Sequence, residues 1–228
     1  MIRLGRKPLA GLGILILLAA CGTRSVDPTS LLDSSSRRMQ QLKGFHFQMD
    51  ITGFTSQGVP VSRAEGDAHP PDLESRVDLK EGGVLLEVDV VEVQTQLYLK
   101  SFTGGWQRLT AEQVAALFDP HELFDPQNGL FAALRETQGP TASGSQNVGG
   151  RTTQVVKGKL AASRVHQLLP PIRSEGNYSA TYLIDPSDDT LWRATVSGNL
   201  FNASESSTIT FNFSKHDQPV TVTPPVVG

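Results

Sequence analysis

Cysteine is almost absent from this chain, since Cys21 is the only one in 228 residues. A single cysteine excludes an intramolecular disulfide, so a packed core must stabilise the fold. The longest apolar run, residues 9–20, is shorter than the roughly 20 residues that a helix needs to cross a bilayer. Charged side chains make up 19% of the chain, with a slight excess of acid. This balance argues against nucleic acid as a partner.

Catalytic and metal-binding motifs are also missing. The five histidines are scattered, with no pair four residues apart to bind zinc. There is no G-x-S-x-G elbow, no P-loop and no G-x-G-x-x-G. Asp185, Asp188 and Asp189 could suggest a calcium site, but a hairpin turn accounts for them better. We therefore expect no catalytic residue, no metal and no cofactor.

The first 20 residues are typical of an export signal, with three basic residues, no acid and the apolar run. Residues 18–21 read Leu-Ala-Ala-Cys, which resembles the lipobox of bacterial lipoproteins. We predict that residues 1–20 are removed and that the thiolate of Cys21 takes a diacylglycerol. The alternative is an ordinary secretory signal with an incidental cysteine. Two or three acyl chains anchor a protein stably, which places it on the outer face of the cell membrane, in a periplasm-like space.

The mature chain is predicted to be a short tether followed by one domain. Removing the signal takes away three of the 20 basic side chains and none of the 23 acidic ones, which leaves a formal charge of −6. Residues 21–27 form the lipidated cysteine and tether, and residues 28–228 form a single domain. No linker or repeat interrupts that span.

The period of the apolar residues changes several times along the domain. Asp27-Pro28 begins a predicted helix that runs to about residue 43. Residues 45–52 then alternate between apolar and polar side chains, which indicates a half-buried strand. Similar alternation predicts further strands at 61–69, 76–80, 84–91, 96–101, 145–148, 151–159, 178–185, 190–199 and 206–214.

Helices interrupt this series of strands. A capping box at residues 110–113 and Asp-Pro pairs at 119–120 and 125–126 predict three short helices, and a fourth spans about 161–169. The pattern indicates an α+β fold with a single large antiparallel sheet. A sheet that wide must curl, because strands twist. Helices would then pack in its concave face and, where they fill it incompletely, leave an apolar cavity.

Several stretches together resemble a known family. They are the lipobox, Gly44-Phe45-His46-Phe47, Tyr98 before Trp106, residues 118–130, Gly158-Lys159, Pro170-Pro171, and residues 182–185 and 191–196. They are similar to the LppX/LprA/LprF/LprG family of actinobacterial lipoproteins, and most of all to its LprG branch. The last strand departs from the family pattern, because it ends in Ser214-Lys215-His216-Asp217 where an aromatic and a glycine are common.

The resemblance implies a half-barrel sheet, similar in shape to the LolA/LolB carriers, around a cavity for the acyl chains of lipids or glycolipids. Family members are not enzymes. They move triacylated glycolipids, lipoglycans or other lipids from the inner membrane to the outer envelope, some with a major-facilitator exporter. The expected cavity measures several hundred Å³ or more, since drug-sized pockets already occupy about 300–1,000 Å³.

A lipid cavity needs only inward-facing apolar residues, so the alternating strands and the helices supply the candidates. The predicted lining is Phe45, Phe47, Met49, Val77, Leu79, Leu86, Val88, Leu117, Leu130, Leu134 and Tyr182. The alternative for each is a core residue that touches only protein. Arg76 and Gln107 are candidates to meet a headgroup at the rim.

Two hypotheses from different classes follow. The first is a carrier that binds lipid or glycolipid inside the domain and is held on the membrane through Cys21. The second is an accessory or structural lipoprotein that partners a membrane exporter through its surface and carries no lipid. An unrecognised hydrolase is a distant third.

Overall fold

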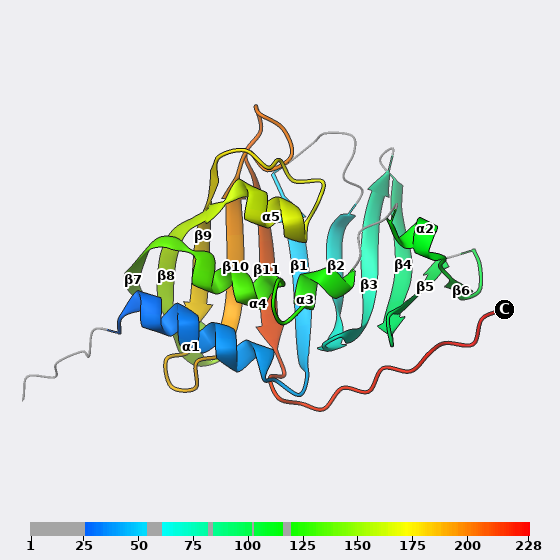
Figure 1. Cartoon of the computed structure of the whole chain (residues 1–228), viewed down its shortest axis with the longest axis horizontal. Helices are drawn as coiled ribbons and strands as arrows, with labels where there is room; N and C mark the ends of the chain where they lie inside the picture. Colours follow the sequence, from blue (N-terminus) through cyan, green and yellow to red (C-terminus); the bar gives the residue numbers. More distant parts are fainter. Residues whose placement is uncertain (1–25, 54–60, 82–83, 102, 116–119) are drawn as a thin grey trace, which may run out of the picture.

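The computed structural model describes residues 26–53, 61–81, 84–101, 103–115 and 120–228 (Figure 1). Within them, eleven strands form one antiparallel sheet in the order β6-β5-β4-β3-β2-β1-β11-β10-β9-β8-β7. Two series of consecutive strands, β1 to β6 and β7 to β11, meet where β1 pairs with β11. The α+β prediction with a single antiparallel sheet is confirmed.

The elements have the following bounds. The strands are β1 (Phe45–Thr52), β2 (Val61–His69), β3 (Asp72–Glu81), β4 (Val84–Val93), β5 (Gln96–Ser101), β6 (Gln107–Arg108), β7 (Gln138–Val148), β8 (Arg151–Ala161), β9 (Asn177–Ile184), β10 (Leu191–Gly198) and β11 (Ser207–Ser214). The helices are α1 (Pro28–Gln40), α2 (Ala111–Ala115), α3 (Pro120–Phe124), α4 (Leu130–Ala133), η1 (Leu134–Glu136) and α5 (Ala162–Leu168).

Helix α1 begins as its sequence predicts. The carboxylate of Asp27 accepts a hydrogen bond from the backbone N–H of Ser30 at 2.9 Å, and Pro28 occupies the first helical position. The side-chain and backbone hydrogen bonds from Ser30 lower the pKa of Asp27. The helix ends at Gln40, three residues before the predicted boundary. Leu31, Leu32 and Met39 are buried on its inner face.

Helices cover one part of the sheet more than the other. Figure 1 shows α1, α4 and α5 across the strands from β7 to β1, while β3, β4 and β5 extend beyond them. Strand β1 turns Phe45, Phe47 and Met49 toward the helices and leaves the intervening side chains half-buried. The main core therefore lies between these helices and the strands around β1, β11 and β10.

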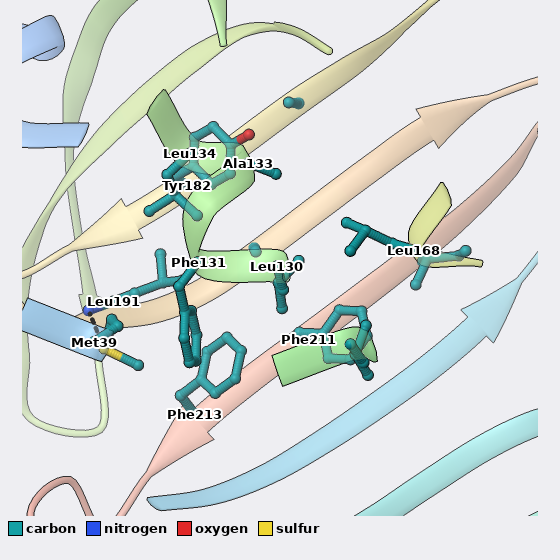
Figure 2. Packing of buried hydrophobic residues seen from close by; sticks show 14 of the residues in the cluster. Met39, Leu130, Phe131, Ala133, Leu134, Leu168, Tyr182, Leu191, Phe211 and Phe213 are labelled. Atoms are coloured by element: carbon teal, nitrogen blue, oxygen red, sulfur yellow. Dashed lines mark hydrogen bonds between the residues drawn. The ribbon is translucent and has the colours of Figure 1, made fainter. Parts of the chain in front are cut away.

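Aromatic rings form the centre of this core. The ring of Phe45 makes edge contacts with those of Phe124, Phe131 and Phe213, with centroids 5.2, 5.4 and 5.7 Å apart. Figure 2 shows Phe131 and Phe213 next to one another, with Met39 beside Leu191. Such pairs add roughly 0.5–1.5 kcal/mol each beyond the burial of their area. Helices and sheet are thus joined through ring packing.

Strand β7 is longer than the sequence indicates. Its predicted extent was 145–148, but it begins at Gln138. It is one of the two edge strands of the sheet, and its pairing with β8 shifts register twice. Gly139 and Gly144 adopt φ of +56° and +80° there. A proline is tolerated on an edge, and such irregularities discourage pairing with another chain.

Candidate functional site

An apolar cavity of about 220 Å³ lies between the concave face of the sheet and the segments that cover it. Ser75 is its one polar lining residue in the part of the chain that the structure describes. The lining comprises Phe47, Met49, Ile51, Val61, Ala64, Leu73, Ser75, Val77, Leu79, Val88, Val90, Leu97, Leu99, Leu123, Phe124, Leu169, Pro171, Ile172, Phe201, Ile209 and Phe211.

The cavity separates two groups of packed side chains. On one side is the main core. On the other is a small cluster of Val88, Val90 and Leu97 on β4 and β5. Val77 on β3 packs against both groups, so it stands at the boundary between them. The cavity therefore has two walls that belong to different parts of the sheet.

Small residues account for some of the space. Ala64 on β2 lies opposite Met49 in the β1–β2 register, and Ser75 on β3 lies opposite Val90. Short side chains at these positions occupy little of the space, and Phe124 of α3 is part of the same lining. Because protein interiors otherwise pack densely, an apolar gap of this size is unusual and available to a ligand.

A second void of about 30 Å³ continues beneath α5. It shares Leu123, Leu169, Ile209 and Phe211 with the larger cavity. Its apolar lining gives water no hydrogen-bond partner. The apolar space therefore extends in a narrow form toward β9 and β10.

Seven of the residues predicted to line a cavity border one of these spaces. Phe47, Met49, Val77, Leu79 and Val88 line the larger cavity. Leu130 and Tyr182 line the smaller void. The hydroxyl of Tyr182 lies 2.9 Å from that of Thr137, and burial raises the pKa of Tyr182 to about 12. Its ring thus remains neutral and its one polar atom is satisfied within the protein.

The other predicted residues lie elsewhere. Phe45 belongs to the aromatic cluster, and Leu134 is 1% exposed in the core. Leu86 faces the cavity side, opposite Leu79, but lies outside the lining. Leu117 and Cys21 fall outside the described residues. The physical difference is distance from the gap, since all the placed residues point inward.

The two headgroup candidates lie away from the cavity. Arg76 precedes Val77 on β3 and so points to the opposite face, where its Nε lies 3.1 Å from Glu87 and 3.3 Å from Asp89. The hydrogen bond to Asp89 raises the pKa of Arg76. Gln107 is exposed on the edge strand β6.

Sequence reasoning missed part of the lining. Leu97 continues the alternating pattern of the inward strands and was detectable on that ground. Pro171 and Phe201 come from loops, where no period marks an inward direction. The volume is also smaller than expected, about 220 Å³ in place of several hundred.

Metal-ligating side chains and Asp185 are candidates for a polar site. No cluster of three or more metal-ligating side chains occurs among them. Asp185 accepts hydrogen bonds from the backbone and hydroxyl of Ser187 as part of the predicted turn. Burial would raise the pKa of Asp185, but these bonds and Arg151 hold it lower. None of the described helices is long and apolar enough to cross a membrane.

Comparison with known proteins decides the family. The model of the LppX_LprAFG lipoprotein family matches residues 27–222. The chain belongs to this family. Among the LppX_LprAFG relatives, "Lipoarabinomannan carrier protein LprG" of Mycobacterium tuberculosis strain H37Rv is 25% identical over 204 residues, which are 89% of this chain and 84% of the relative. LprG of Mycolicibacterium smegmatis is 24% identical over 220 residues, 92% of this chain and 90% of that one.

Solved structures of LppX_LprAFG members share the fold. LprF of Mycobacterium bovis superposes with a TM-score of 0.72 at 18% identity, over 88% of this chain and 97% of that one. Lipoprotein LppX of Mycobacterium tuberculosis superposes with a TM-score of 0.62 at 19% identity, over 86% and 97%. The protein is therefore an LprG-like lipoprotein with the LprF and LppX architecture.

Proposed function

We propose that this lipoprotein carries a lipid or glycolipid of the triacylated or lipoglycan type. The apolar cavity would hold acyl chains of the ligand, and the protein would assist movement of that ligand from the inner membrane to the outer envelope. The observation that supports this most is the cavity itself, lined by apolar side chains in a domain of this family. Each acyl methylene removed from water contributes about 0.8 kcal/mol. A non-catalytic role suits such a lining, because Ser75 is its one polar residue among the residues that the structure describes.

The membrane is the proposed place of loading. Lipid on Cys21 would hold the chain on the outer face of the inner membrane, and residues 21–27 would separate the anchor from α1. Seven extended residues span at most about 25 Å, at roughly 3.5 Å each. The domain would therefore exchange lipid at the bilayer surface, where a major-facilitator exporter is a suitable partner.

The test is a substitution on β3 that fills the cavity with a larger side chain. Val77→Trp places a large ring in the space, whereas Glu74→Trp, three residues earlier on the same strand and exposed on the opposite face, is the matched control. Both are made in a Cys21→Ala background, which cannot receive the lipid anchor. The proteins are purified from a mycolate-containing host and examined by native mass spectrometry. We expect a bound diacyl or triacyl lipid in the parent and in Glu74→Trp, and little or none in Val77→Trp.

Circular dichroism and thermal unfolding check that all three proteins are folded. If the parent retains no lipid, or if Val77→Trp retains as much as the control, the carrier proposal is wrong. The lipidated variants separate the accessory role from the carrier role. Val77→Trp that loses lipid but restores envelope function in a deletion strain would favour an accessory lipoprotein acting through its surface.

A further inference from the structure

Residues 215–218 form a turn after β11 and residues 219–228 continue as an extended segment, so that residues 215–228 link the two walls of the cavity. Figure 1 shows this segment, in red, leaving β11 near the middle of the sheet and running past the ends of the neighbouring strands toward β5 and β6. We call it the C-terminal strap. It starts beside the part of the sheet that α1, α4 and α5 cover and ends beside the part that extends beyond these three helices.

The first end of the strap is held firmly. Asp217 accepts a hydrogen bond from Arg38 of α1 at 2.5 Å and another from the backbone N–H of Lys43 at 3.1 Å. His216 lies 2.9 Å from the carbonyl oxygen of Leu191. The hydrogen bond from Arg38 lowers the pKa of Asp217, so this carboxylate stays charged at neutral pH. Helix, sheet and strap therefore meet at this point.

The middle of the strap packs against the domain but is not a strand of the sheet. Val220 lies so close to Gly44 that a Cβ added there would be 2.8 Å from its Cγ2 atom. Val220 and Val222 are half-buried, while the threonines that follow each of them are exposed. Three prolines in this segment lack an N–H to donate to a ladder. The segment therefore lies against the domain as a band without becoming a strand.

The far end is held weakly. Val227 forms a single parallel bridge to Trp106, the residue before β6. Val226 is 90% exposed and Val227 is 49% exposed, so little apolar area is buried there. The Nζ atom of Lys100 on β5 lies 5.9 Å from the Trp106 ring centre. Release of this end costs less than release of the end at Asp217.

We propose that the C-terminal strap is a latch that limits the width of the cavity, and that release of its Val227 end lets β4 and β5 move away from the main core to admit a lipid with several acyl chains. The proposal rests on the proposed carrier function. The cavity separates the main core from the cluster on β4 and β5, and the strap connects the two sides. At about 220 Å³ the closed cavity is below the range of drug-sized pockets, about 300–1,000 Å³. A larger ligand requires the walls to separate.

A disulfide across the weak end tests the latch directly. Bridged strand residues lie about 4.8 Å apart, which suits the Cα separation of a disulfide, about 4.4–6.8 Å. The test protein combines Trp106→Cys and Val227→Cys in the Cys21→Ala background. It contains no cysteine besides these two. Uptake of a fluorescent diacyl phospholipid from vesicles is measured for the oxidised and reduced forms of this same protein. A single-chain fatty acid serves as the second probe, and each single variant is a control for oxidation.

We expect the oxidised form to take up the diacyl probe about tenfold more slowly than the reduced form, because uptake scales with the fraction of open molecules. The fatty acid should be taken up equally by both. A truncation that removes residues 219–228 but keeps Asp217 should accelerate diacyl uptake. Equal rates in the oxidised and reduced proteins, or no acceleration on truncation, would overturn the latch while leaving the carrier proposal intact. Absence of uptake in the parent would overturn both.

Discussion

At the scale of single residues, His216 packs and hydrogen-bonds against the start of β10. Its Nε2 atom lies 2.9 Å from the carbonyl oxygen of Leu191, and its ring centre is 4.9 Å from that of Trp192. Burial lowers the pKa of His216 below the ordinary 6.5, with Arg38 and Arg151 acting in the same direction. The hydrogen bond to Leu191 and the charge of Asp188 oppose this change.

This environment predicts an acid-sensitive contribution to stability. The unfolded chain binds a proton at His216 before the folded chain does, so the contribution is complete above pH 6.5 and is lost as pH falls toward the lower folded pKa. We expect the free energy of unfolding to decrease between about pH 7 and pH 5, and to decrease less in His216→Gln. Urea titrations at both pH values measure this. An equal decrease in the two proteins would contradict it.

At the scale of elements, Arg164 joins α5 to the turn that starts α4. Its guanidinium donates to the carbonyl oxygens of Asn128 at 2.7 Å and Gly129 at 3.2 Å, and to Glu136 at 2.8 Å. The side chain of Arg164 is 9% exposed. One cation thus joins α4, η1 and α5, and α4 and α5 contribute Leu130, Val165 and Leu168 to the lining of the smaller void.

Arg164→Met should destabilise the fold by about 2 kcal/mol, because it removes the charge-assisted hydrogen bonds to Asn128, Gly129 and Glu136. Arg37→Met is the matched control. Arg37 forms an exposed i,i+4 ion pair with Asp33, and such pairs contribute roughly 0.3–0.5 kcal/mol. Chemical denaturation of both variants gives the two differences. Equally small decreases in the free energy of unfolding for the two variants would show that the carbonyl contacts of Arg164 do not stabilise the packing of the helices.

At the scale of the whole molecule, the sheet has a thickly covered part and a thinly covered part. The main core packs the strands around β1, β10 and β11 against helices. The cluster of Val88, Val90 and Leu97 is small and lies across the cavity from it. Segments with fewer buried apolar contacts open more readily, so stability should differ between the two parts.

Hydrogen exchange followed by mass spectrometry should show this difference. We expect the backbone amides of β4 and β5 to exchange faster than those of β10 and β11, since local opening needs to disrupt only the smaller cluster. Bound lipid should slow exchange in β4 and β5 most, because it fills the space beside them. Equal protection of β4 and β10 in the lipid-free protein would contradict the division into two parts.

The period of the apolar residues was sufficient to predict most of the helices and strands. The alternation of β1 and the Asp-Pro start of α1 predicted both elements, because pleat and cap are local properties of the chain. The first half of β7 carried no such signal, since an edge strand exposed on both faces needs no apolar period. The strap was visible only as a Pro/Val tail, because its contacts are with residues distant in sequence.

Phe45 and Phe47 show which property of a side chain the sequence decides and which one the tertiary structure decides. They are two residues apart on β1, so the sequence determines that both point to the concave face. Phe45 is enclosed by rings from α3, α4 and β11, whereas Phe47 borders the cavity. The direction of a side chain follows from backbone geometry alone. What it meets depends on where α3 and the loops lie, and only tertiary packing sets that.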